Sequence, residues 1–279
     1  MLRPFLAQVQ DNRRGLMSVG VIDPGMTGEA ESKLPKIAAA FWVMKISATT
    51  LGETAGDLLS MTMNVGYAAS SLILVSGFLV SLVAQLLSKR YHPALYWTVI
   101  LSTSTAGTTM SDYMDRTLGL GYTQGAALLI TILLCLFAAW RLTTGTLSVD
   151  HVKTRKAELF YWIAILFSNT LGTALGDFLA DSSGLGFLGG ALLISGLLLL
   201  VLLATVLTRL SRVLLFWVAF VLTRPLGATV GDVLTKSKDK GGLNFGTLGA
   251  SAILAGMLVA LVAWSMVKEK RSRAGSALT

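Results

Sequence analysis

Cysteine and histidine are scarce in this chain of 279 residues: Cys135 is the single cysteine, and His92 and His151 are the two histidines. A lone cysteine forms neither a disulfide nor a thiolate metal site within one chain. Zinc, copper and nickel favour thiolate and imidazole ligands, so the sequence serves these metals poorly. It also has no phosphate-binding loop and no serine–histidine pairing within its apolar segments. We therefore expect no enzyme and no resident cofactor.

Charged residues are also scarce, because they make up 14% of the chain, whereas soluble domains contain about a quarter. The hydrophobic share is 53% and the mean hydropathy is +0.68. The apolar residues form eight blocks of about twenty residues, the length that crosses a bilayer core of about 30 Å. The blocks cover residues 36–58, 66–88, 93–115, 121–142, 157–180, 184–208, 212–235 and 245–267. We expect an all-α integral membrane protein with eight transmembrane helices.

The net charge of +8 is distributed in a way that indicates orientation in a membrane and not binding to nucleic acid. Of the 23 lysines and arginines, 17 lie in the two terminal tails and in three alternate loops. By the positive-inside rule, both termini are therefore expected to be cytoplasmic. The opposite connections contain only Arg116, Lys236, Lys238 and Lys240. The tryptophans are expected to form an interfacial belt at the cytoplasmic boundary: Trp42, Trp97, Trp140, Trp162, Trp217 and Trp264.

One motif occurs four times. The stretch "FWVMKISATTLGETAGD" aligns without gaps with "YWTVILSTSTAGTTMSD", "YWIAILFSNTLGTALGD" and "FWVAFVLTRPLGATVGD". A tryptophan is shared at Trp42, Trp97, Trp162 and Trp217. Ten residues later each copy has a glycine, at Gly52, Gly107, Gly172 and Gly227. Fifteen residues after the tryptophan each copy has an aspartate, at Asp57, Asp112, Asp177 and Asp232. Such a period marks an internal repeat.

This pattern resembles a family of bacterial membrane proteins of unknown function that are built of four tandem two-helix repeats, each marked by a tryptophan. The resemblance implies the architecture and a bacterial inner membrane as the location. We expect a flexible cytoplasmic tail at residues 1–33 and a second cytoplasmic tail at 268–279. Between them, the four repeats are expected at residues 34–92, 93–156, 157–211 and 212–267.

Because each repeat contains two spans, all four repeats have the same orientation and are parallel. The odd spans carry the motif and are expected inside, with the bulky even spans against lipid. Small residues at a spacing of four favour close helix packing, and the alternative is a loosened helix that exposes carbonyl ligands. The residues concerned are Gly52, Gly56, Gly107, Gly172, Gly176, Gly227 and Gly231. Pro225 is expected to kink or break the seventh span.

The motif aspartates follow their tryptophans by about 22 Å along a helix, which places them inside the outer part of the membrane. A carboxylate at the bilayer centre costs about 2.5–3.5 kcal/mol on insertion scales. If these groups converge, their repulsion favours the binding of a cation or of protons. Glu53 lies one turn inward of Asp57. Asp115 and Asp181 end their spans and are also expected in the ion pathway, with helix capping as the alternative role. The expected metal ligands are Glu53, Asp57, Asp112, Asp177 and Asp232.

Polar and basic residues occupy the same spans. The aligned residues Thr49, Ser104, Asn169 and Arg224 form a polar layer that is expected to line the ion pathway. We expect Arg224 and Lys45 to act as internal counter-ions for the carboxylates. For Lys45 the alternative is that its amine reaches the cytoplasmic interface.

Oxygen ligands suit hard cations. We therefore predict a secondary transporter, an exporter, of a hard or borderline divalent cation such as Mn²⁺ or Mg²⁺, driven by protons. Its expected partners are the lipid bilayer, the cation and protons, and no nucleic acid. A cation channel with a ring of aspartates is an alternative. Another is a carrier of organic anions or small solutes that uses Lys45 and Arg224. The identity of the ion and the oligomeric state stay open.

Overall fold

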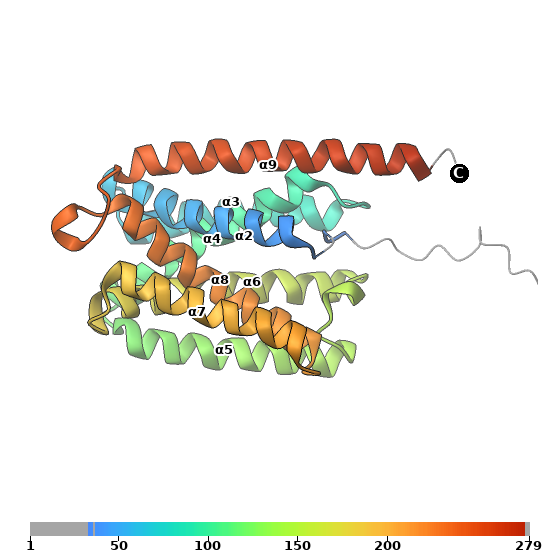
Figure 1. Ribbon diagram of the computed structural model, residues 1–279, viewed down its shortest axis with the longest axis horizontal. Helices are drawn as coiled ribbons and strands as arrows, with labels where there is room; N and C mark the ends of the chain where they lie inside the picture. Colours follow the sequence, from blue (N-terminus) through green and yellow to red (C-terminus); the bar gives the residue numbers. More distant parts are fainter. Residues whose placement is uncertain (1–32, 36, 277–279) are drawn as a thin grey trace, which may run out of the picture. The chain divides into compact units, whose positions relative to one another are not determined.

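The computed structural model describes residues 33–35 and 37–276 (Figure 1). The tail predicted at residues 1–33 therefore lies outside the described residues, apart from Lys33. The described residues form eight long helices and no strand. These are α2 (Ala39–Asp57), α3 (Tyr67–Leu87), α4 (Pro93–Asp112), α5 (Gly121–Thr144), α6 (Arg155–Asp177), α7 (Gly186–Leu207), α8 (Arg212–Thr235) and α9 (Gly246–Ser276). Each helix corresponds to one predicted apolar block, and α9 continues into the predicted C-terminal tail.

The four helices that carry the motif form a closed inner ring. In this ring α2 packs against α4, α4 against α6, α6 against α8, and α8 against α2. We call these the inner helices, and α3, α5, α7 and α9 the outer helices. Each outer helix packs on the inner helix of the next repeat: α3 on α4, α5 on α6 and α7 on α8. The last helix, α9, lies along the first inner helix, α2, and so closes the pattern (Figure 1).

Six helices are long and apolar enough to cross a membrane: α3, α5, α6, α7, α8 and α9. The outer helices are only 17–28% buried in their most apolar stretches, whereas α6 and α8 are 67% and 56% buried. The remaining exposed surface of the outer helices is rich in leucine and valine, as a lipid-facing surface requires. The inner helices α2 and α4 are not among the six, because their serines, threonines and charged residues lower their hydropathy. Most of these polar residues are buried in the protein.

The motif glycines are the points at which neighbouring inner helices touch. A Cβ atom on Gly52 would collide with Ser104 of the next repeat, and one on Gly227 would collide with Thr49. Gly107 packs in the same way on Asn169, and Gly172 packs on Arg224. The inner helices remain α-helical through these glycines. The glycines therefore serve close helix packing, and the alternative of a loosened helix does not occur.

Three of the four inner helices widen directly after the motif aspartate. A single π-helical segment follows in each case: η1 (Leu58–Thr62), η2 (Tyr113–Thr117) and η4 (Phe178–Ser182). Such segments are frequent at functional sites, and the sequence gives no sign of them. In the fourth copy α8 stays α-helical to Thr235, and a 3₁₀ turn, η5 (Lys238–Lys240), follows.

Pro225 was predicted to kink or break the seventh span, and the predicted break is wrong. Helix α8 runs without interruption from Arg212 to Thr235 and includes Pro225. The ring of Pro225 packs over Gly172 of α6, where no side chain competes for the space. Packing against neighbouring helices holds the helix together where its own hydrogen bond is lost.

The predicted tryptophan belt is also wrong for most of its members. Trp97, Trp140, Trp162 and Trp217 are at most 4% exposed, so they belong to the protein core and not to a lipid-facing belt. The three motif tryptophans among them pack with the aromatic residues that precede the motif tryptophans, which are Phe41, Tyr96, Tyr161 and Phe216. Trp140 packs with Phe160 and Trp217. The hydroxyl groups of Tyr96 and Tyr161 lie 2.6 Å apart, and both side chains are buried. We call this group the aromatic layer.

Candidate ion-binding site

The interior of the inner ring holds a buried ion pair between the first and fourth repeats. Arg224 Nη2 donates to Glu53 Oε2 at 2.8 Å, and Arg224 is completely buried while Glu53 is 3% exposed. The same nitrogen donates to the hydroxyl groups of Thr108 and Thr173, at 2.5 and 2.7 Å. Thr108 and Thr173 are the residues aligned with Glu53 in the second and third repeats. One arginine therefore contacts three repeats at the centre of the ring.

Lys45 lies two turns before Glu53 on α2, toward the aromatic layer, and is also completely buried. Its Nζ donates to Asn169 Oδ1 at 3.3 Å and lies 4.1 Å from the centre of the Phe220 ring. Asn169 in turn donates to Thr103 Oγ1 at 2.9 Å. Lys45 thus makes no ion pair among the described residues. Its amine neither pairs with a carboxylate nor reaches the interface, so neither of its two predicted roles is seen.

The four motif aspartates gather at the other end of the inner ring, and we call them the aspartate ring. They are buried, with 3–5% of each residue exposed: Asp57, Asp112, Asp177 and Asp232. Each comes from a different inner helix at the same register, so the parallel repeats place them at one level. Asp57 also interacts electrostatically with Asp112 on the neighbouring helix α4 and with Asp177 on α6.

Two basic residues that follow the motif aspartates of the second and fourth repeats each join a pair of these aspartates. Arg116 Nε lies 2.8 Å from Asp112 Oδ1, and its Nη2 lies 3.1 Å from Asp177 Oδ2. Lys236 Nζ lies 3.1 Å from Asp232 Oδ1 and 3.0 Å from Asp57 Oδ2. Arg116 and Lys236 stand at the same motif position, four residues after the aspartates of the second and fourth repeats. That spacing was visible in the sequence, and it is the signal that could have identified them.

Arg116 and Lys236 are held in their charged forms. Burial by itself lowers the pKa of Lys236, but the carboxylates of Asp232 and Asp57 outweigh it and raise the pKa above its ordinary value. Burial also lowers the pKa of Arg116. The carboxylates of Asp112 and Asp177 outweigh this effect and raise the pKa above its ordinary value. The two basic side chains remain 33% and 25% exposed, so they cover the aspartate ring from the outside.

Three of the carboxylates are close enough to share one metal ion. Oxygen atoms of Glu53, Asp57 and Asp232 all lie within 4.8 Å of one another. Asp57 and Glu53 are one helical turn apart on α2, and Asp232 joins them from α8 because Gly231 lets that helix approach Glu53. Carboxylate oxygens at this separation are the donor set that Mg²⁺, Mn²⁺ and Ca²⁺ prefer.

Two other predicted acids lie apart from the aspartate ring. Asp115 accepts a hydrogen bond from Ser111 at 3.2 Å, and its carboxylate lies against Gly125 of the outer helix α5. Asp181 is exposed and accepts a hydrogen bond from the Tyr122 hydroxyl at 3.2 Å. In the polar layer, Thr49 donates to the carbonyl of Thr223 at 3.3 Å, across the contact between α2 and α8.

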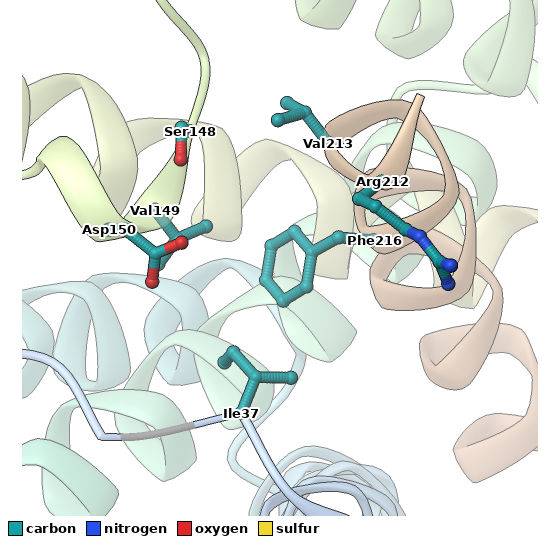
Figure 2. Close-up of a pocket in the computed structure, with 7 residues that line it drawn as sticks. All are labelled: Ile37, Ser148, Val149, Asp150, Arg212, Val213 and Phe216. Carbon is teal, nitrogen blue, oxygen red and sulfur yellow. The ribbon is translucent and has the colours of Figure 1, made fainter. Parts of the chain in front are cut away.

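The described pockets lie away from the centre of the ring. A pocket of about 350 Å³ is formed by α8, the segment around Val149 and the residues before α2. Figure 2 shows the ring of Phe216 pointing into it between Val149 and Ile37. A larger apolar groove of about 730 Å³ runs between α2, α7 and α8. Phe216, which lines both, also packs on Phe41 and Phe220 and so belongs to the aromatic layer.

Comparison with known families reproduces the fourfold division. The family model described as Repeat of Unknown Function (DUF347) matches residues 40–91, 95–146, 160–211 and 215–271. The chain belongs to this family. No curated protein and no solved structure matches the chain. Each matched DUF347 repeat contains one inner and one outer helix, and its outer helix packs on the inner helix of the next repeat. The repeats are therefore interlocked.

Proposed function

We propose that this DUF347 protein is a secondary transporter that exchanges a hard or borderline divalent cation, such as Mn²⁺ or Mg²⁺, for protons at the aspartate ring. The observation that carries the proposal is the imbalance of charge in that ring. Among the residues that the structure describes, the four buried aspartates have two basic partners, Arg116 and Lys236. With all six groups ionised, the formal charge of the ring is −2.

An excess of buried negative charge is costly unless something positive relieves it. One divalent cation or two protons would bring the ring to neutrality, so the two ligands compete for the same carboxylates. Glu53 does not change this balance, because Arg224 already neutralises it. Competition at a single site is the basis of exchange between a metal ion and protons.

The proposal includes a position in the membrane. We infer that all eight helices cross the bacterial inner membrane, with both termini cytoplasmic. The polar helices α2 and α4 are surrounded by other helices, so their low hydropathy does not prevent them from spanning. In this orientation the aromatic layer is near the cytoplasm and the aspartate ring is near the outside. Export is our proposed direction.

A transporter fits the closed ends of the inner ring better than a permanently open channel does. Packed aromatic side chains fill the ring beyond Lys45, and the bridges of Arg116 and Lys236 cover the aspartates at the other end. Glu53, Arg224 and Pro225 each occur in one repeat only, which breaks the fourfold symmetry. Alternating access requires such an asymmetry because one part must move relative to another.

Ion-dependent stabilisation of the purified protein tests the binding site. Mn²⁺ or Mg²⁺ should raise the melting temperature of the wild type, because a ligand that binds only the folded state stabilises it. Asp57→Asn and Asp232→Asn change two of the three carboxylates that could share one ion, and each should abolish that rise and leave the protein folded. Asp181→Asn is the matched control, since Asp181 is exposed and outside the ring. An unchanged ion response in both ring variants would overturn the proposed site.

A further inference from the structure

A second cluster of charge lies inside the inner ring, and it has the opposite sign. Lys45 and Arg224 are both completely buried, and they are near enough to repel one another electrostatically. Glu53 is the only carboxylate among the described residues that pairs with either of them. With all three groups ionised, the cluster has a formal charge of +1. This cluster is on the side of Glu53 that faces the aromatic layer.

Several donors in this cluster find no acceptor. All the hydrogen bonds of Arg224 are made by Nη2, while Nε and Nη1 are buried and have no partner in the described part of the chain. The Lys45 amine can donate three hydrogen bonds and makes one, to Asn169. Buried polar groups in folded proteins nearly always have a partner, so these donors call for an acceptor that the side chains do not supply.

We propose that a small monovalent anion of halide size binds between Lys45 and Arg224. Such an anion accepts hydrogen bonds from several donors at once, and it brings the cluster to electrical neutrality. A water molecule would satisfy the donors but would leave the positive charge uncompensated in a low-dielectric interior. The cluster shares Glu53 with the group of three carboxylates that could hold a metal ion, but it contains no member of the aspartate ring. The proposal therefore does not depend on cation transport.

The repeats themselves supply the variant that tests the anion site. The residues aligned with Lys45 in the other three copies are Ile100, Ile165 and Phe220, all buried. An apolar side chain therefore fits this position in the fold, and Lys45→Ile removes one of the two cations without adding a new group. Lys89→Ile is the control, because Lys89 is exposed on the loop after α3.

The experiment compares the melting temperature of the purified protein in sodium chloride and in sodium gluconate at equal ionic strength. Gluconate is too large for a buried halide site, so the wild type and Lys89→Ile should melt several degrees lower in gluconate than in chloride. Lys45→Ile should melt at the same temperature in both salts. Asp112→Asn should keep the dependence on chloride, which separates this result from any failure of the cation site.

Crystals of the wild type grown in sodium bromide give a second readout that does not require a variant to fold. Anomalous scattering should show a bromide ion between the Lys45 amine and the Arg224 guanidinium. Equal melting of the wild type in chloride and gluconate, or crystals without a bromide peak at this position, would overturn the proposal.

Discussion

At the scale of single residues, the central feature is an arginine that depends on one carboxylate. Arg224 is completely buried, and Glu53 is its only ionic partner among the described residues. Removing one member of a buried ion pair leaves the other charge uncompensated and costs about 3–5 kcal/mol. Removing both members avoids that penalty, because no buried charge is left behind.

We therefore predict that Glu53→Gln lowers the melting temperature strongly, whereas the double variant Glu53→Gln with Arg224→Gln regains most of the loss. The measurement is a double-mutant cycle of thermal unfolding with the purified protein, in which both single variants are included. A double variant that melts at the sum of the two single effects would show that the pair makes no contribution as a pair.

The positions of the motif aspartates could be predicted from the sequence, and their basic partners were not predicted. The repeat predicted that Asp57, Asp112, Asp177 and Asp232 occupy equivalent positions, and the structure places them at one level. The partners of these acids were not predicted, because Arg116 and Lys236 follow their spans and were counted with the loops. Whether a basic residue at a helix end turns inward depends on the neighbouring helix, which the sequence of one segment does not contain.

At the scale of helices, glycine determines how closely the ring can pack. A Cβ atom on Gly56 would lie 2.9 Å from Thr108, and on Gly107 it would lie 2.9 Å from the backbone of Thr170. Contacts this short force a backbone to move. The small residues of the motif can be recognised in the sequence, because they recur every four residues, which is the spacing of one helix face.

We predict that Gly52→Ala destabilises the protein by about 1–3 kcal/mol, the usual cost of adding a methyl group to a filled interior. Its Cβ would collide with the side chain of Ser104 on α4. Gly196→Ala on α7 is the matched control, because no atom lies within 4 Å of the added carbon. Thermal unfolding of the two variants is the measurement, and equal melting temperatures would contradict the proposed role of the motif glycine.

The packing of α8 explains why the predicted break at Pro225 does not occur. Proline removes a hydrogen bond and crowds the preceding turn of an isolated helix. In the ring, however, Pro225 faces Gly172, and the inner helices on both sides confine α8. The tertiary packing therefore overrides the local preference. The three π-helical segments were not predicted either, because nothing in their sequences marks them.

At the scale of the whole molecule, the chain closes on itself. The first inner helix, α2, receives its outer helix from the last repeat, because α9 packs on α2 as α3 packs on α4. The repeat pattern predicted the number of helices and their division into an inner and an outer set. It could not predict that each outer helix packs on the inner helix of the following repeat. Packing on the inner helix of its own repeat would satisfy the same pattern of apolar residues.

In our account, the function depends on the closed ring of the four inner helices. Four parallel helices bring one aspartate each to a common level, and the two basic residues leave the ring with an excess of negative charge. That excess is what a divalent cation and protons would compete to neutralise. The aromatic layer closes the other end of the ring, so passage of an ion requires the inner helices to move.

The most direct test is transport by the purified protein in liposomes that contain an indicator of Mn²⁺. A pH gradient across the liposome membrane should drive Mn²⁺ against the direction of proton flow. Asp112→Asn should abolish this flux, and Asp181→Asn should preserve it. A Mn²⁺ flux that does not respond to the pH gradient, or one that Asp112→Asn leaves unchanged, would contradict the exchange of cation and protons at the aspartate ring.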